Sequence, residues 1–129
     1  MSCVDTDILI DFLNNKKEAV EKIDELREND ALSTTYINSF ELLKGKAELS
    51  KNSKEDSIDI LLNNLFIYGF DFEASKKAAN MFKELKRNGN LIDFADMMIA
   101  SICIANDETL LTRNIKHFER IPGLKIEKI

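Results

Sequence analysis

The chain has 129 residues, of which 44% are apolar and 32% charged, as is typical of one globular domain that buries a core without disulfides or a structural metal. Its net charge of −5 argues against binding nucleic acid through bulk positive charge, and its single histidine disfavours zinc hydrolases. No apolar run approaches the roughly 20 residues that span a bilayer, and we find no signal peptide, so we expect a cytoplasmic protein without a membrane partner.

Strands and helices are predicted to alternate along the sequence. The apolar run at residues 1–4 predicts a first strand, and Thr6 or Asp7 is expected to cap the helix that follows. Further strands are predicted at residues 31–35, 65–70, 108–112 and 124–129. Apolar residues at helical spacing predict five helices around Ile8, Leu9 and Phe12; Ala19, Ile23 and Leu26; Ile37, Phe40, Leu43 and Ala47; Ile58, Leu61, Leu62 and Leu65; and Ala74, Ala78, Met81 and Leu85.

The last predicted helix, residues 95–105, is apolar on almost every side and should be buried at the centre of the protein. Asn88-Gly89 is a C-cap signal for the helix before it. Strands separated by helices imply parallel pairing, so we predict a single α/β domain over residues 1–129. It should be an α/β/α sandwich with a central parallel sheet of about five strands. In such folds the active site lies at the carboxyl ends of the strands.

Four polar residues are expected at that edge of the sheet. Asp5 follows the first strand, Glu41 lies one turn into the helix after the second, Asp96 begins the buried helix, and Asn114 follows the fourth strand. Three carboxylates and an amide form an all-oxygen set, which favours Mg²⁺ or Mn²⁺ over zinc. Such ions can activate water for phosphodiester cleavage.

Each acid alone has a simpler explanation. Asp5 can cap the following helix, Glu41 can be a surface residue, and Asp96 can complement the helix dipole. Gly45, one turn after Glu41 in a predicted helix interior, would leave space over that carboxylate. The hypothesis of a metal site therefore depends on convergence of the acids in space.

The sequence resembles PIN-domain ribonucleases of the VapC toxin type. The matching segments are "VDTDILIDFL", "LSTTYINSFELLKGKAE" and "LKRNGNLIDFADMMIASICIANDETLLTRNIKHFERIPGLKIE", of which the closing "LLTRN..HF..IPGL" is the most specific. The resemblance implies a Mg²⁺- or Mn²⁺-dependent endoribonuclease, a cognate VapB-like antitoxin that covers the site, and commonly a homodimer. Asp5, Glu41 and Asp96 match the family's metal-binding acidic triad, and Asn114 stands where many members have a fourth acid.

Supporting roles are implied for Thr6 beside the first acid and Thr112 near the last. Asp93 is expected to be an N-cap with a possible contact to the site, Asp7 a helix-start group, and His117 a structural polar group rather than a catalyst. Basic residues that could meet RNA phosphates, each individually also explained as a solvated charge, are Lys44, Lys46, Arg113, Lys116 and Arg120.

Two other functions stay open at this point. One is a PIN-domain nuclease of RNA processing or decay that has no antitoxin. The other is a non-catalytic α/β domain that binds a partner, as receiver domains do. The segments "LFIYGFD" and "LLTRN" offer no convincing aspartate–lysine pair of the kind a receiver needs.

Overall fold

A five-stranded, entirely parallel sheet lies at the centre of the protein, in the order β3-β2-β1-β4-β5. The computed structural model describes residues 1–45 and 55–129. The strands are β1 (Ser2–Val4), β2 (Leu32–Thr35), β3 (Phe66–Tyr68), β4 (Thr109–Leu111) and β5 (Lys125–Glu127). The helices are α1 (Thr6–Leu13), α2 (Lys17–Glu28), α3 (Tyr36–Lys44), α4 (Glu55–Asn63), α5 (Phe72–Arg87), α6 (Phe94–Ala105) and α7 (Ile115–Phe118).

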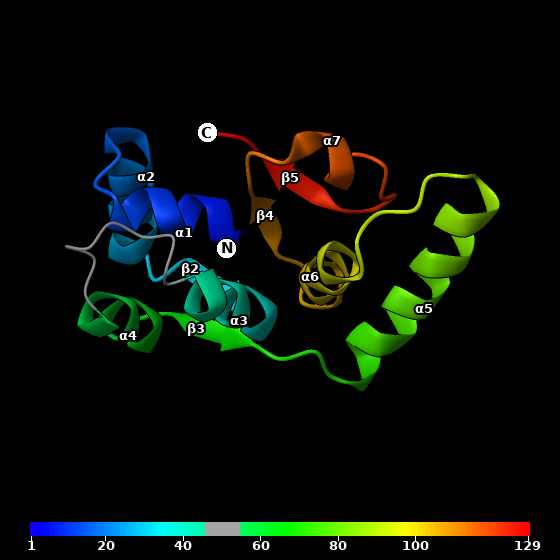
Figure 1. Ribbon diagram of the computed structural model, residues 1–129, viewed down its shortest axis with the longest axis horizontal. Helices are drawn as coiled ribbons and strands as arrows, with labels where there is room; N and C mark the ends of the chain where they lie inside the picture. Colours follow the sequence, from blue (N-terminus) through cyan, green and yellow to red (C-terminus); the bar gives the residue numbers. More distant parts are fainter. Residues whose placement is uncertain (46–54) are drawn as a thin grey trace.

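Helices cover both faces of the sheet (Figure 1), as the predicted α/β/α sandwich requires. Side chains alternate between the two faces along a strand. Val4 and Leu111 therefore pack into one hydrophobic cluster with α1, α2 and α4. Their neighbours Cys3 and Leu110 pack into a second cluster with α5, α6 and α7. None of the helices within residues 1–45 and 55–129 is long and apolar enough to cross a membrane.

Local sequence signals explain several helix boundaries. The Thr35 side chain accepts a hydrogen bond from the Asn38 amide and begins α3, and Asp71 accepts one from the Ala74 amide and begins α5. The predicted stop at Asn88-Gly89 is confirmed: Asn88 is the C-cap of α5, and Gly89 has φ 69°, a left-handed conformation that suits glycine.

Three local predictions are wrong. Asp5, not Thr6 or Asp7, is the N-cap of α1, because α1 starts immediately after the first strand. Gly45 is the C-cap of α3 and not an interior residue, so the argument for open space beside Glu41 fails. The four-residue helix α7 was not predicted, since it is too short to show a periodic pattern.

The helix predicted from Ile37, Phe40, Leu43 and Ala47 exists as α3, but its apolar pattern does not mark its buried face. Phe40 is 63% exposed and Leu43 is 45% exposed. The buried residues of α3 are Asn38, Ser39 and Leu42. Ala47 and Lys46 lie outside the described residues.

The buried helix α6 should contribute strongly to stability. Ile99 is fully buried in the second cluster, so Ile99→Ala should lower the free energy of unfolding by about 2–5 kcal/mol. Ile60 on α4 is 63% exposed, so Ile60→Ala makes the same chemical change and should cost far less. Urea denaturation of both variants measures the difference, and equal losses would contradict the burial pattern.

Candidate active site

The carboxyl end of the central strand carries the most constrained acid of the protein. Asp5 follows β1, which lies between β2 and β4, and it is only 7% exposed. Its Oδ1 accepts hydrogen bonds from the Thr6 amide at 2.9 Å and from Asn38 Nδ2 at 3.0 Å. Its Oδ2 accepts one from Thr112 Oγ1 at 2.6 Å. Donors from α1, α3 and the end of β4 thus fix this carboxylate.

Glu41 is joined to the same network through hydroxyl and amide groups. Thr6 Oγ1 donates to Glu41 Oε1 at 2.8 Å, and Asn38 Nδ2 also donates to Thr6 Oγ1 at 2.9 Å. Asn38 is fully buried, and its Oδ1 accepts a hydrogen bond from Thr35 Oγ1 at 2.7 Å. The buried amide of Asn38 therefore orients Asp5 directly and orients Glu41 through the Thr6 hydroxyl.

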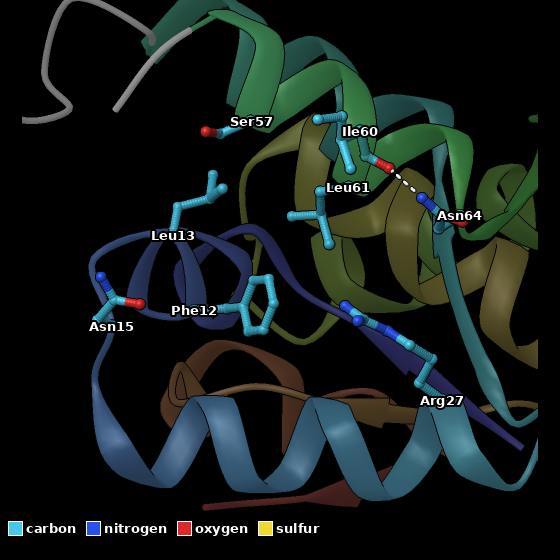
Figure 2. A pocket seen from close by; sticks show the side chains of 8 residues that line it. All are labelled: Phe12, Leu13, Asn15, Arg27, Ser57, Ile60, Leu61 and Asn64. Atoms are coloured by element: carbon cyan, nitrogen blue, oxygen red, sulfur yellow. Dashed lines mark hydrogen bonds between the residues drawn. The ribbon is translucent and has the colours of Figure 1, made fainter. Parts of the chain in front are cut away.

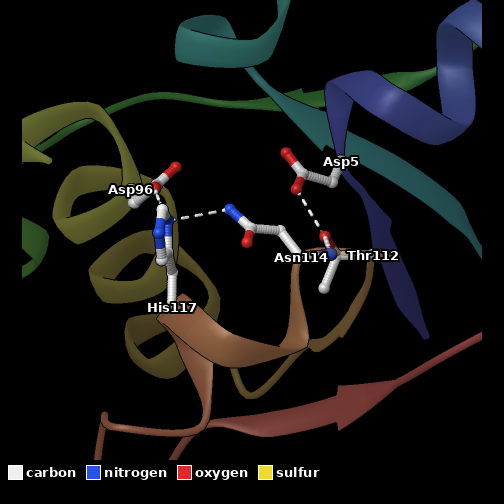
Figure 3. A network of polar contacts seen from close by, with 5 residues as sticks. All are labelled: Asp5, Asp96, Thr112, Asn114 and His117. Carbon is white, nitrogen blue, oxygen red and sulfur yellow. Dashed lines mark hydrogen bonds and ion pairs between the residues drawn. The ribbon is translucent and has the colours of Figure 1, made fainter. Parts of the chain in front are cut away.

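Asp96 enters the site from α6, and Asn114 enters from the segment after β4. Figure 3 shows the Asn114 side chain between Asp5 and Asp96. His117 Nδ1 lies 3.0 Å from Asn114 Nδ2 and 3.2 Å from Asp96 Oδ2. The backbone N–H of Asn114 donates to Thr112 Oγ1 at 3.0 Å. Since Thr112 also contacts Asp5, this hydrogen bond connects the contacts of Asn114 and His117 with Asp5.

The protonation of the His117 ring decides whether Nδ1 is a hydrogen-bond donor or an acceptor toward these two neighbours. Nδ1 carries either a proton or a lone pair, so it cannot donate to Asp96 and accept from Asn114 at once. With Asp96 ionised, a protonated Nδ1 donates to Oδ2, and a flip of the Asn114 amide would turn its oxygen toward the ring. His117 thus holds one oxygen of Asp96 in place.

The surroundings of Asp5, Asp7 and Asp96 disfavour the ionised forms of these three acids. Burial, with smaller contributions from the nearby charges of Asp7 and Asp96, raises the pKa of Asp5 from 3.8 to about 6 against the lowering effect of the Thr112 and Thr6 hydrogen bonds. Burial also raises the pKa of Asp7. It raises the pKa of Asp96 as well, while the His117 hydrogen bond lowers it.

The predicted site residues fall into two linked groups. Asp5, Thr6, Glu41 and Thr112 share direct hydrogen bonds, whereas Asp96 joins Asn114 through His117. We call Asp5, Glu41 and Asp96 the acidic site. Within residues 1–45 and 55–129, no three His, Cys, Asp or Glu side chains are arranged closely enough to hold one metal ion.

Other residues differ from the expectations drawn from the sequence. Asp93 is the N-cap of α6, as expected, but its side chain accepts no capping hydrogen bond and is exposed. Asp7, expected only as a helix-start group, accepts hydrogen bonds from the amides of Ile8 and Arg113. Asn38 was missed; an amide one turn before Glu41 was the only available signal. His117 was noticed, but its contact with Asp96 was not predicted.

Comparisons with known proteins identify the family of the chain. The family model described as "PIN domain" matches residues 2–124. The chain is 32% identical to "Ribonuclease VapC2" of Rickettsia felis, over 96% of this chain and 94% of that protein. It is 34% identical to "Ribonuclease VapC1" of Methanocaldococcus jannaschii, over 95% of this chain and 84% of that protein.

Solved structures show the same fold. The chain superposes on a chain of VapBC2 from Rickettsia felis bound to a promoter DNA fragment with a TM-score of 0.88, 30% identity and coverage of 99% of this chain and 98% of that one. For DNA-bound VapBC from Salmonella typhimurium the TM-score is 0.86, with 26% identity and coverage of 98% and 96%. The family model and these identities show that the chain belongs to the PIN domain family.

Proposed function

We propose that residues 1–129 form a single-domain, metal-dependent endoribonuclease that acts as a VapC-like toxin in the cytoplasm and is neutralised by a cognate VapB-like antitoxin. The observation that supports the catalytic part is the buried Asp5 at the carboxyl end of the central strand, held by three hydrogen bonds, with Glu41 linked to it through Thr6 and Asp96 near enough for its charge to act on Asp5. Relatives named ribonuclease VapC and structural neighbours named VapBC support the toxin part.

Asp5, Glu41 and Asp96 would hold Mg²⁺ or Mn²⁺, with Asn114 beside them. Their oxygen donors suit a hard cation, and the raised pKa values of Asp5 and Asp96 indicate negative groups that a cation would stabilise. The three side chains do not form a ligand shell in the described part of the chain, so binding would require Glu41 and Asp96 to move toward Asp5.

When bound, the ion supplies the Lewis acid for phosphodiester hydrolysis by water. The chain's own residues supply orientation. Thr112 and Asn38 hold the two oxygens of Asp5 in fixed directions, and Asn38 fixes the Thr6 hydroxyl that contacts Glu41. His117 contacts Oδ2 of Asp96 and so orients that carboxylate. No protein nucleophile is needed.

The roles of Asp96 and Asp93 separate in a cleavage assay. Asp96→Asn should reduce cleavage of a fluorescent RNA in Mn²⁺ by more than about 100-fold, because it removes a charged ligand. Asp93→Ser should retain most of the activity, since Asp93 is exposed and makes no capping hydrogen bond. EDTA should abolish wild-type cleavage. An active Asp96→Asn with an inactive Asp93→Ser would reject this assignment, and full activity in EDTA would reject metal dependence.

The raised pKa of Asp5 predicts a specific dependence of stability on pH. A folded-state pKa of about 6 favours the protonated form, so this contribution is fully present below about pH 4 and is lost as the pH rises through about 6. In EDTA, the stability of Asp5→Asn relative to wild type should therefore increase as the pH rises from about 4 to above about 6, by up to about 3 kcal/mol. Urea denaturation near both limits measures it, and a difference that does not change with pH would contradict the prediction.

The cation itself provides the complementary control. Mn²⁺ should raise the melting temperature of the wild type at neutral pH, where Asp5 is ionised, because it binds only the folded state. It should raise that of Asp5→Asn much less. An equal rise in both proteins would place the bound ion away from Asp5.

A groove with mixed apolar and polar lining lies away from the acidic site and suits the antitoxin. It has a volume of about 400 Å³ and is formed by side chains of α1, α2 and α4 (Figure 2). Phe12, Leu13, Ile60 and Leu61 supply its apolar lining, and Arg27 lies over the Phe12 ring. An amphipathic antitoxin helix with an acidic residue toward Arg27 would fit this lining.

Ile60→Glu tests the groove. The side chain is 63% exposed, so the variant should fold and cleave RNA like wild type but lose most of its affinity for the proposed antitoxin. Leu91→Glu, at a residue 46% exposed outside the groove, is the matched control. Calorimetric titration with the antitoxin gives both affinities, and tight binding to Ile60→Glu would exclude this groove as the docking site.

We also infer a homodimer. Large apolar side chains remain exposed on and near α3 and β3, which is unusual for a monomer surface. They include Tyr36, Phe40, Leu43, Phe66 and Phe72. A second copy of the chain would cover them.

A further inference from the structure

A cleft lined mainly by basic side chains lies beside the acidic site. It has a volume of about 430 Å³ and is lined by Lys16, Lys17, Glu18 and Arg113. These residues come from the start of α2 and from the segment that follows β4. Three cations and one anion line the cleft, and two of the cations also contact acids outside its lining: Arg113 contacts Asp11, and Lys17 contacts Glu21. The cleft therefore concentrates basic side chains on a protein whose net charge is −5.

Arg113 is held in a fixed position at one side of this cleft. Its backbone N–H donates to Asp7 Oδ2 at 3.1 Å, and its guanidinium forms an ion pair with Asp11 Oδ2. That oxygen is buried and has no hydrogen bond of good geometry among the described residues, so Arg113 is the cation that compensates it. The Arg113 side chain is still 42% exposed, which leaves donors available to a ligand.

The two lysines at the other side are less constrained. Lys17 Nζ is 3.8 Å from Glu21 Oε1, but both side chains are largely exposed, and such a pair contributes little and exchanges readily. Lys16 forms no ion pair with any described residue. Lys16 is also the N-cap of α2, whose first turn lacks a side-chain cap, so backbone N–H groups add positive potential on the same side.

The cleft adjoins the acidic site through the backbone. Arg113 follows Thr112, whose hydroxyl donates to Asp5 Oδ2, and precedes Asn114. A polyanion bound at the acidic site would be repelled by its uncompensated carboxylates, and binding energy must come from cations next to it. Phosphate contacts of this kind position a nucleic acid without reading its sequence.

We propose that Lys16, Lys17 and Arg113 bind a backbone phosphate of single-stranded RNA next to the acidic site, and so place the chain for cleavage. This inference rests on the proposed ribonuclease function and names a substrate contact for it. The Asp11 ion pair presents the guanidinium in advance, and the two lysines close around the phosphate from the opposite side.

The lysines provide the test, because changing Arg113 would leave the buried Asp11 oxygen without a cation. In Lys16→Gln/Lys17→Gln, two charges are lost from exposed positions. Lys76→Gln/Lys77→Gln on α5 makes the same change at an exposed adjacent pair elsewhere and is the control. Binding of fluorescein-labelled oligouridine is measured by anisotropy in EDTA, so that no cleavage occurs, over a series of KCl concentrations.

We expect Lys16→Gln/Lys17→Gln to weaken binding about tenfold and to reduce the slope of log Kd against log salt by about 1.4, since each lost contact to a single strand contributes about 0.7. The control should match wild type in both. In Mn²⁺, the same double variant should raise KM for RNA cleavage while kcat changes little, because the lysines position the substrate.

An affinity and salt slope equal to wild type would overturn the proposal, as would an equal loss in the control. This outcome is distinct from failure of the proposed function. A wild-type protein that cleaves no RNA in Mn²⁺ would reject the proposed ribonuclease function. The binding experiment in EDTA would still show whether the cleft binds RNA.

Discussion

The site is organised around one desolvated carboxylate at the carboxyl end of the central strand. An acid removed from water is costly unless donors or a cation compensate it, and the donors of Asp5 come from three segments. Thr6 is adjacent to it in the chain, Asn38 reaches it from α3, and Thr112 reaches it from the end of β4. The parallel register, with Val4 opposite Leu111, is what brings these donors together. Since burial still raises the pKa of Asp5 to about 6, these hydrogen bonds only partly compensate the charge.

The three residues after β4 connect this carboxylate to the rest of the surface. Thr112 contacts Asp5, the amide of Arg113 contacts Asp7, and the side chain of Asn114 contacts His117, which in turn contacts Asp96. Residues 112–114 therefore contact Asp5, Asp7 and His117, and the same segment carries the guanidinium of Arg113. This explains how a protein with a net charge of −5 can place negative and positive groups side by side, as hydrolysis of a polyanion requires.

Helix α1 links the acidic site with the groove proposed for the antitoxin. Its N-terminus is capped by Asp5, and Asp7 and Asp11 lie one turn apart on the side that meets Arg113. Its last residues, Phe12 and Leu13, line the groove with α2 and α4. Helix α1 therefore contributes residues both to the surroundings of Asp5 and to the groove.

The sequence by itself determined the alternation of strands and helices, and with it the parallel sheet and the position of Asp5 at the carboxyl end of the first strand. Periodicity and caps report interactions between residues a few positions apart, and these are sufficient for such elements. Only the tertiary structure decided how the acids are held. The Thr112–Asp5 and Asn38–Asp5 bonds join residues 107 and 33 positions apart, and no local pattern encodes them. The outward face of α3, the contact of His117 with Asp96, and the approach of Lys16 and Lys17 to Arg113 likewise depend on packing between distant segments.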